Sequence, residues 1–175
     1  GMTLTERLLD EYYIIAKNKN TIMKHLKHLF TALLLLCATA ATAHDFVVDG
    51  IYYNITDDTD KTIDVTYRGF YSDSYDNEYT GSVVIPESVT YNGTTYSVTS
   101  IRSEAFEGCE GLTSIEIPSS VTSIGEYAFY GCTGLTNIIV ESGNMYYDSR
   151  DNCNAIIETA TNTLLAGCQK TIIPN

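Results

Sequence analysis

The chain has 175 residues, of which 44% are hydrophobic, and its 22 acidic and 10 basic residues give a formal net charge of −12. This balance excludes nucleic acid and anionic membrane surfaces as partners, since both require clustered lysine and arginine. The sequence has no zinc signature, phosphate loop or nucleophile elbow. We therefore expect no metal, no cofactor and no enzymatic activity.

Residues 23–43 have the layout of a secretory signal peptide, with a basic start, a short apolar run and an A-x-A site that ends at Ala43. The apolar run is shorter than the ~20 residues that span a bilayer. We expect cleavage near Ala43, secretion or display at the cell surface, and no transmembrane span in the mature chain. We interpret residues 1–22 as a scar glycine followed by a segment upstream of the true start at Met23.

The mature chain is expected to begin at His44 and to form one domain. Residues 44–175 keep five basic and nineteen acidic side chains, so their net charge is about −14. Residues 44–82 predict a β-rich N-terminal cap. It would begin with a hairpin that turns at Asp49-Gly50, because Asp-Gly between β-forming residues favours a type I′ turn.

The segment 98–140 contains the same pattern twice, 23 residues apart. Equivalent pairs include Val98 and Val121, Phe106 and Phe129, and Ile115 and Ile138. A period of ~20–29 residues with an L-x-x-L-x-L core is typical of a leucine-rich repeat solenoid. We predict an α+β, mostly β fold, in which short strands alternate with single helical turns across residues 83–175.

The outer units of this solenoid are longer than 23 residues, and we attribute the difference to inserted β-hairpins. The first insertion contains Asn92-Gly93, a strong hairpin signal. The second covers residues 154–165. If its turn centres on Ala160-Thr161, Cys153 and Cys168 face each other and are expected to form a disulfide. A one-residue bulge would break that pairing, and the two thiols would then stay apart.

The repeated string Ser-Val-Thr-Ser-Ile-x-x-x-Ala-Phe-x-Gly-Cys-x-Gly-Leu-Thr-x-Ile-x-Ile-Pro occurs at residues 97–118 and, with Val140-Glu141 at its end, at residues 120–141. It resembles the BspA-type leucine-rich repeat of bacterial surface proteins. The resemblance implies a secreted or surface-anchored protein of anaerobic, often host-associated bacteria. Some members of that family act as adhesins for host matrix proteins.

The repeat alignment predicts a candidate binding surface on the strands. The outward residue between two inward strand anchors is Val84, Glu116, Ile139 and Ile172 in the four units. Stacked units would bring these residues into one row, flanked by Ser114 and Asn137 on the same strand face. An apolar row on an exposed face often marks a partner site. The alternative is that neighbouring hairpins cover it.

A second candidate surface is a tyrosine-rich loop. Tyr71, Tyr75 and Tyr79 recur at every fourth residue among glycine, serine and aspartate residues that disfavour a helix. Such a loop suits recognition of sugar or protein; the alternative is that its tyrosines lie over the cap. The sequence thus predicts an exported, non-enzymatic module that binds host or matrix proteins. A carbohydrate-binding accessory protein that uses these tyrosines is the alternative.

Overall fold

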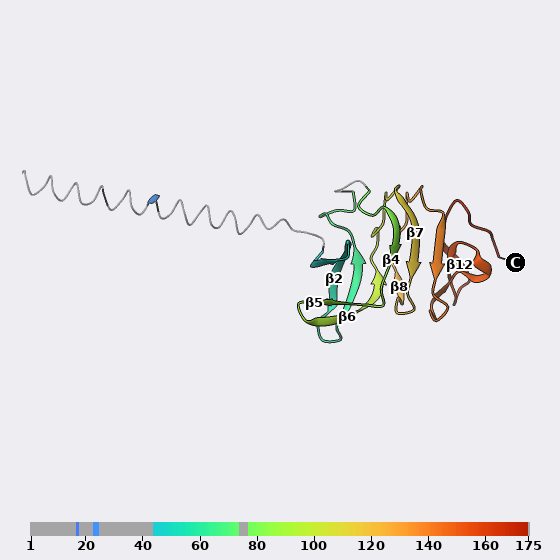
Figure 1. Cartoon of the computed structure of the whole chain (residues 1–175), viewed down its shortest axis with the longest axis horizontal. Coiled ribbons are helices and arrows are strands. Elements are labelled where there is room, and N and C mark those ends of the chain that lie inside the picture. Colours follow the sequence, from blue (N-terminus) through green and yellow to red (C-terminus); the bar gives the residue numbers. More distant parts are fainter. Residues whose placement is uncertain (1–16, 18–22, 25–43, 74–76, 175) are drawn as a thin grey trace, which may run out of the picture. The chain divides into compact units, whose positions relative to one another are not determined.

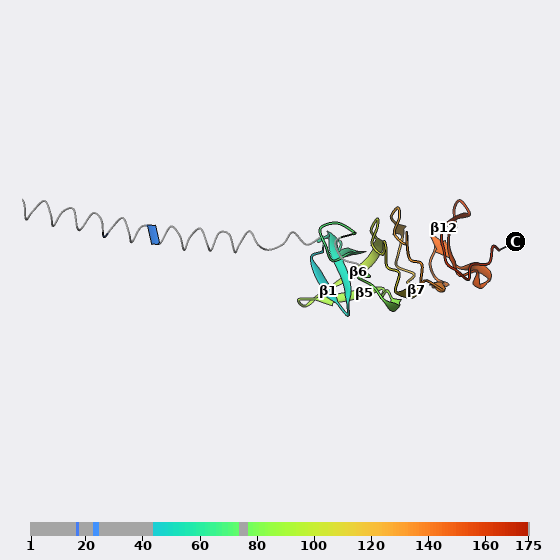
Figure 2. The same cartoon turned by 90° about the horizontal axis from the view of Figure 1, so that it is seen from above.

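The computed structural model describes residues 44–73 and 77–174, together with Lys17, Met23 and Lys24. The predicted signal peptide therefore lies outside the described residues, apart from its first two positions. From residue 44 onward the chain passes from a group of β-hairpins through successive short strands to a terminal hairpin (Figure 1). The same order is visible in the perpendicular view (Figure 2).

Within these ranges the chain is mostly β, with one short 3-10 segment, η1, at Arg150–Asn152. The strands are β1 Phe46–Val48, β2 Ile51–Asp57, β3 Thr62–Thr66, β4 Gly81–Val84, β5 Ser88–Tyr91, β6 Thr94–Ile101, β7 Leu112–Ile117, β8 Ser123–Ile124, β9 Asn137–Val140, β10 Tyr147–Asp148, β11 Ala155–Glu158 and β12 Thr163–Gly167. No helix in the described part of the chain is long and apolar enough to cross a membrane.

The first sheet has the order β1-β2-β3-β6-β5, and β8 pairs with β6 outside that path. Tight turns connect two of its three hairpins, β1–β2 at Asp49-Gly50 and β5–β6 at Asn92-Gly93, and all four residues have positive φ. The sheet curls strongly, because the ring of Phe46 on β1 stacks on that of Tyr91 on β5, with centroids 4.3 Å apart. Its two outermost strands therefore approach each other.

The second sheet, β4-β7-β9, is entirely parallel. Ser114 pairs with Asn137 and Ile115 with Ile138, which are the equivalent positions of the two similar segments. Side chains alternate across the sheet, so Ile115 and Ile138 are buried on the inner face while their neighbours point outward. Parallel strands joined by turns in this way place equivalent residues beside one another.

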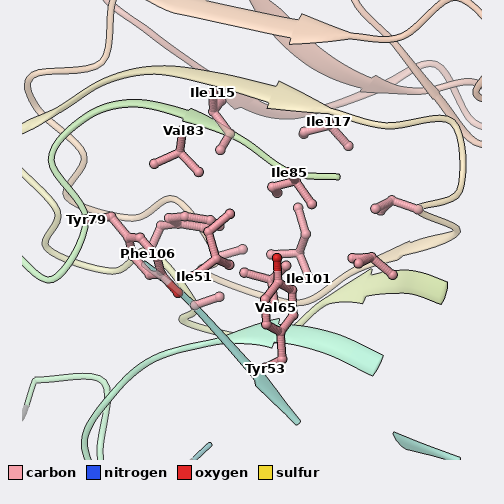
Figure 3. Packing of buried hydrophobic residues seen from close by; sticks show 14 of the residues in the cluster. Ile51, Tyr53, Val65, Tyr79, Val83, Ile85, Ile101, Phe106, Ile115 and Ile117 are labelled. Carbon is pink, nitrogen blue, oxygen red and sulfur yellow. The ribbon is translucent and has the colours of Figure 1, made fainter. Parts of the chain in front are cut away.

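The hydrophobic core lies between the two sheets (Figure 3). Val83 and Ile115 of the parallel sheet point toward Val65 and Ile101 of the first sheet. At one end of this core the rings of Phe106 and Phe129 stack, with centroids 5.1 Å apart and planes 6° apart. Burial of these side chains is the main favourable contribution to folding.

The predicted single helical turns are wrong. Residues 103–108 form successive turns, and Glu104 has φ of 63°, a left-handed conformation that interrupts a right-handed helix. Main-chain groups here bond to the next unit: Glu104 N–H donates to the carbonyl of Glu126, and Phe106 N–H to that of Ala128. The alternate amides bond within the segment, Ala105 N–H to the carbonyl of Arg102 and Glu107 N–H to that of Glu104, so the chain forms single turns that are stacked on the next unit.

The last sheet, β10-β11-β12, is antiparallel. The buried side chain of Asn144 connects it to the preceding repeat, because Nδ2 donates to the carbonyls of Pro118 and Val121. Its Oδ1 accepts the amide hydrogens of Tyr146 and Tyr147. All four interactions satisfy polar groups at a buried junction, where an unpaired group would be costly.

Candidate functional site

The outer face of the β4-β7-β9 sheet carries two rows of outward residues. Val84 pairs with Glu116, and Glu116 with Ile139, which forms the first row. In the second row Ser114 lies beside Asn137, whose Nδ2 donates to the Ser114 hydroxyl over 3.1 Å. We call these five residues the strand face. The parallel register brings them together.

Hairpins do not cover the apolar members of the strand face. Val84 is 58% exposed and Ile139 is 41% exposed, with the half-buried Glu116 between them. A hollow of about 390 Å³ adjoins Val84 and is also lined by Asp49, Glu78 and other residues of the β1–β2 turn and β4. The strand face is therefore an open apolar ridge with a carboxylate at its centre and a hollow at one end.

Ile172 does not join this row. It lies outside every described strand, is 68% exposed, and its N–H donates to the carbonyl of Cys153 over 2.9 Å. The β11–β12 hairpin intervenes between β9 and residue 172, and the chain after it follows the hairpin rather than the parallel sheet. The predicted four-residue row is therefore a row of three.

The structure describes two of the three tyrosines of the predicted loop, and it places them differently. Tyr71 is 65% exposed and makes an edge-on contact with Phe70. Tyr75 lies outside the described residues. Tyr79 is a core residue: its hydroxyl donates to the Thr66 carbonyl over 2.5 Å and accepts the N–H of Tyr52. Burial also raises the pKa of Tyr79 far above its ordinary value. Because its side chain is buried, Tyr79 is not part of an exposed loop surface.

Cys153 and Cys168 are both free thiols in the structure. The pairing of β11 with β12 shifts between Ile156 and Ile157, which is the one-residue irregularity that separates the cysteines. Instead, the Cys168 thiol contacts the carbonyl of Asn154. The structure thus has the one-residue bulge named as the alternative: the assumed register holds at Ile157 and Glu158 but is shifted by one residue at Ile156 and Ala155, toward the cysteines, and the two thiols stay apart.

The cysteines of the repeats are also free. The Cys132 thiol donates to the carbonyl of Phe106 over 3.1 Å, and burial raises its pKa to about 12. Burial also raises the pKa of Cys109. Thiols with such pKa values are poor nucleophiles and poor metal ligands at neutral pH, because both roles require the thiolate. Among the residues that the structure describes, no group of acidic, histidine or cysteine side chains is arranged to hold a metal ion.

A surface that the sequence analysis missed lies where the turn at residues 125–131 meets the β11–β12 hairpin. Tyr127 and Tyr130 are 64% and 65% exposed, and their rings meet edge to face with centroids 6.0 Å apart. They line a groove of about 520 Å³ whose walls include Ile156 and Leu165. The repeat alignment could have indicated this surface, because Tyr127 and Tyr130 occupy the positions that Glu104 and Glu107 occupy in the preceding unit. Tyrosines at positions where the other unit has charged residues are expected to be exposed.

One buried carboxyl group has an altered pKa. Asp64 on β3 is 9% exposed, and its Oδ1 has no hydrogen-bond partner among the described residues. Burial raises its pKa to about 6, although the charge of Arg102 opposes the shift. The charged form is therefore costly in the folded state. Asp64 belongs to the first sheet and lies apart from the strand face in the sheet order.

We expect Asp64→Asn to stabilise the protein in a pH-dependent way. Since the pKa is higher in the folded state, the protonated group favours folding below about pH 4, and this contribution is lost as the pH rises through about 6. The substitution should raise the free energy of unfolding by ~1–3 kcal/mol at pH 8 and hardly at all at pH 4. Urea denaturation at both pH values measures this, and an equal effect at both would contradict it.

Comparisons with known proteins agree with the repeat pattern. The model of a family described as the BspA type leucine rich repeat region matches residues 70–163, in six copies. No curated protein matches the chain.

Several solved structures are similar in sequence over part of their length. A leucine-rich repeat protein from Bacteroides ovatus is 38% identical, with a TM-score of 0.47, over 57% of this chain and 24% of that one. A leucine rich cell surface protein from Faecalibacterium prausnitzii is 26% identical, with a TM-score of 0.43, over 56% and 24%. A leucine-rich repeat protein from Bacteroides capillosus is 29% identical, with a TM-score of 0.43, over 58% and 66%. The chain thus spans about a quarter of the first two proteins.

Proposed function

Because the chain belongs to the BspA-type leucine-rich repeat family, we propose that it is an exported, non-enzymatic module that adheres to host or matrix proteins through its strand face. Leucine-rich repeat domains generally act as protein-interaction modules, and BspA-type members are typically bacterial surface or secreted proteins. A stacked array suits this role because it presents an extended surface and encloses little volume.

The observation that carries the proposal is the exposed row Val84–Glu116–Ile139. Two aliphatic side chains, on β4 and β9 at either side of β7, are exposed to solvent, although the inner face of the same sheet buries its aliphatic residues. Exposed apolar ridges of this kind gain free energy when a partner covers them. The hollow beside Val84 offers a place for an anchoring side chain, and anchors in pockets dominate many interfaces.

The proposal includes the organisation inferred from the sequence. A signal peptide over residues 23–43 would direct export and be removed near Ala43. Residues 44–82 would act as the N-terminal cap. Residues 83–175 would form a solenoid of 23-residue period, with hairpins inserted in its outer units. The parallel pairing of Ser114 with Asn137, 23 residues apart, supports that period.

The carbohydrate alternative loses one of its three tyrosines. Of the three tyrosines proposed for it, Tyr79 is buried, and Tyr71 is the one that the structure places on the surface. Stacking platforms for sugars need exposed rings. An array of glycans tests this alternative directly; a glycan whose binding is lost on Tyr71→Ala would restore it.

We expect Val84→Glu and Ile139→Glu each to weaken binding to a matrix protein by about tenfold, since each places a charge in a desolvated contact. Immobilised, purified host matrix proteins and biolayer interferometry provide the measurement. Val47→Glu is the matched control, because Val47 is 49% exposed on β1, away from the strand face. Its binding should change less than about twofold.

Two outcomes would contradict the proposal. One is that no protein of the matrix panel binds the unmodified chain. The other is that Val47→Glu weakens binding as much as Val84→Glu does, which would show that a general increase in negative charge, and not the strand face, controls the interaction.

A further inference from the structure

We propose that a second surface, formed by the turns between strands, binds an extended segment of a partner protein that is rich in lysine and arginine. We call this surface the turn face and define it by Glu104, Glu107, Glu126, Tyr127 and Tyr130. It shares no residue with the strand face, so the inference goes beyond the function proposed above.

Main-chain hydrogen bonds hold the two halves of the turn face together. Glu104 N–H donates to the Glu126 carbonyl over 3.0 Å, and Gly108 N–H donates to the Tyr130 carbonyl over 2.8 Å. This pattern aligns the turn that contains Glu104 and Glu107 with the turn that contains Tyr127 and Tyr130. Acidic residues of one unit therefore belong to the turn next to the exposed tyrosines of the following unit.

The tyrosines supply the apolar part of this surface. Each ring is about two-thirds exposed, and both border the groove of about 520 Å³ that continues to Leu165. A cation over a tyrosine ring gains ~0.5–2 kcal/mol from the electrons of the ring. The aliphatic stem of a lysine or arginine can cover the ring at the same time. Tyrosine also loses little conformational entropy when a partner binds.

The acidic side chains of the two repeats favour a positively charged partner. Residues 98–140 contain a single basic residue, Arg102, and five acidic residues, of which Glu116 belongs to the strand face. The other four are Glu104, Glu107, Glu110 and Glu126, and all of them lie in the turns. With Arg102 as its one basic residue, this segment keeps a negative net charge. Acidic partners are repelled from such a surface, and basic ones are attracted.

A second pair of exposed aromatic rings adjoins the turn face. The Ser72 hydroxyl donates to Glu107 Oε2 over 2.6 Å, which holds the loop at residues 70–73 against the first turn. In that loop Phe70 and Tyr71 are 58% and 65% exposed and meet edge to face, with centroids 4.7 Å apart. The turn that contains Glu107 thus adjoins both the loop of Phe70 and Tyr71 and the turn of Tyr127 and Tyr130, which suits an extended segment that carries several cations better than a single small ligand.

The test uses a fluorescein-labelled peptide of alternating lysine and serine, and a control peptide of alternating glutamate and serine. Fluorescence anisotropy with the 175-residue chain should show binding of the basic peptide alone, and this binding should weaken as salt is added. The double variant Tyr127→Ala with Tyr130→Ala should lose at least tenfold in affinity. Tyr146→Ala is the matched control, because Tyr146 is 50% exposed and does not line the groove, and it should stay within twofold.

Charge is tested separately. Glu104→Gln combined with Glu126→Gln should weaken binding about tenfold at low salt and flatten its salt dependence, while Asp60→Asn, in the β2–β3 turn, should have no effect.

Three results would overturn the proposal: absence of basic-peptide binding, equal binding of the acidic peptide, or equal losses of affinity in Tyr146→Ala and in the double tyrosine variant. So would displacement of the peptide by a neutral oligosaccharide. Matrix binding that depends on Val84 is measured independently, so either proposal can fail without the other.

Discussion

Gly134→Ala is expected to abolish the folded state or to lower its free energy of unfolding by at least ~3 kcal/mol. A Cβ atom at this position would lie 2.0 Å from the carbonyl oxygen of Glu110 in the preceding unit. That atom belongs to the backbone, so it can move only if the two units separate. The close approach therefore makes glycine necessary here. Urea denaturation followed by circular dichroism measures the change.

Gly143→Ala is the control for this substitution. A Cβ at Gly143 would meet the side chain of Ser119 at 3.3 Å, a contact that a shift of a few tenths of an ångström relieves. Neither glycine has a positive φ, so the two exchanges differ mainly in the atom that they approach. We expect Gly143→Ala to change stability by less than ~1 kcal/mol. Equal losses in both variants would show that the contact between units at Glu110 is not what limits residue 134.

Phe106→Ala is expected to destabilise the protein by ~3–5 kcal/mol, the range for deletion of a large buried aromatic side chain. Phe106 is fully buried, and its ring contacts Tyr79, with centroids 4.6 Å apart, as well as Phe129. Its removal would leave a cavity between the first sheet and the repeats. Because those surroundings belong to strands and stacked turns, they cannot collapse easily into the space. Thermal and urea unfolding both report the loss.

Phe129→Ala provides an internal comparison. Phe129 occupies the equivalent position of the next unit and stacks on Phe106, yet it is only partly buried. It borders the groove that Tyr127 and Tyr130 line. We expect its loss to cost roughly half as much as that of Phe106, because less apolar surface returns to water. If Phe129→Ala proved the more damaging change, the core would centre on the groove and not on Phe106.

The two surfaces proposed for binding both depend on the stacking that these variants test. The strand face requires β4, β7 and β9 to stay in register, and the turn face requires the bonds from Glu104 and Gly108 to the next unit. Substitutions on the exposed faces, by contrast, should leave stability nearly unchanged. Separate measurement of stability and binding therefore distinguishes loss of a contact residue from loss of the array.

The sequence by itself was sufficient to predict the family and a mostly β leucine-rich repeat fold, because a repeated pattern of inward aliphatic residues depends little on distant parts of the chain. The single helical turns expected between the strands were predicted wrongly: at residues 103–108 Glu104 has a left-handed conformation, and the amide hydrogens of Glu104 and Phe106 bond to the next unit.

Only the tertiary structure decided the candidate sites. Tyr71 and Tyr79 belong to the same four-residue spacing in the sequence, but Tyr71 is exposed and Tyr79 is buried. The Tyr79 hydroxyl forms hydrogen bonds with main-chain groups of Thr66 and Tyr52 on the first sheet. A shift of one residue beside Ile157 separated Cys153 from Cys168. Burial and register arise from contacts between segments far apart in the chain, and periodicity along one segment does not contain that information.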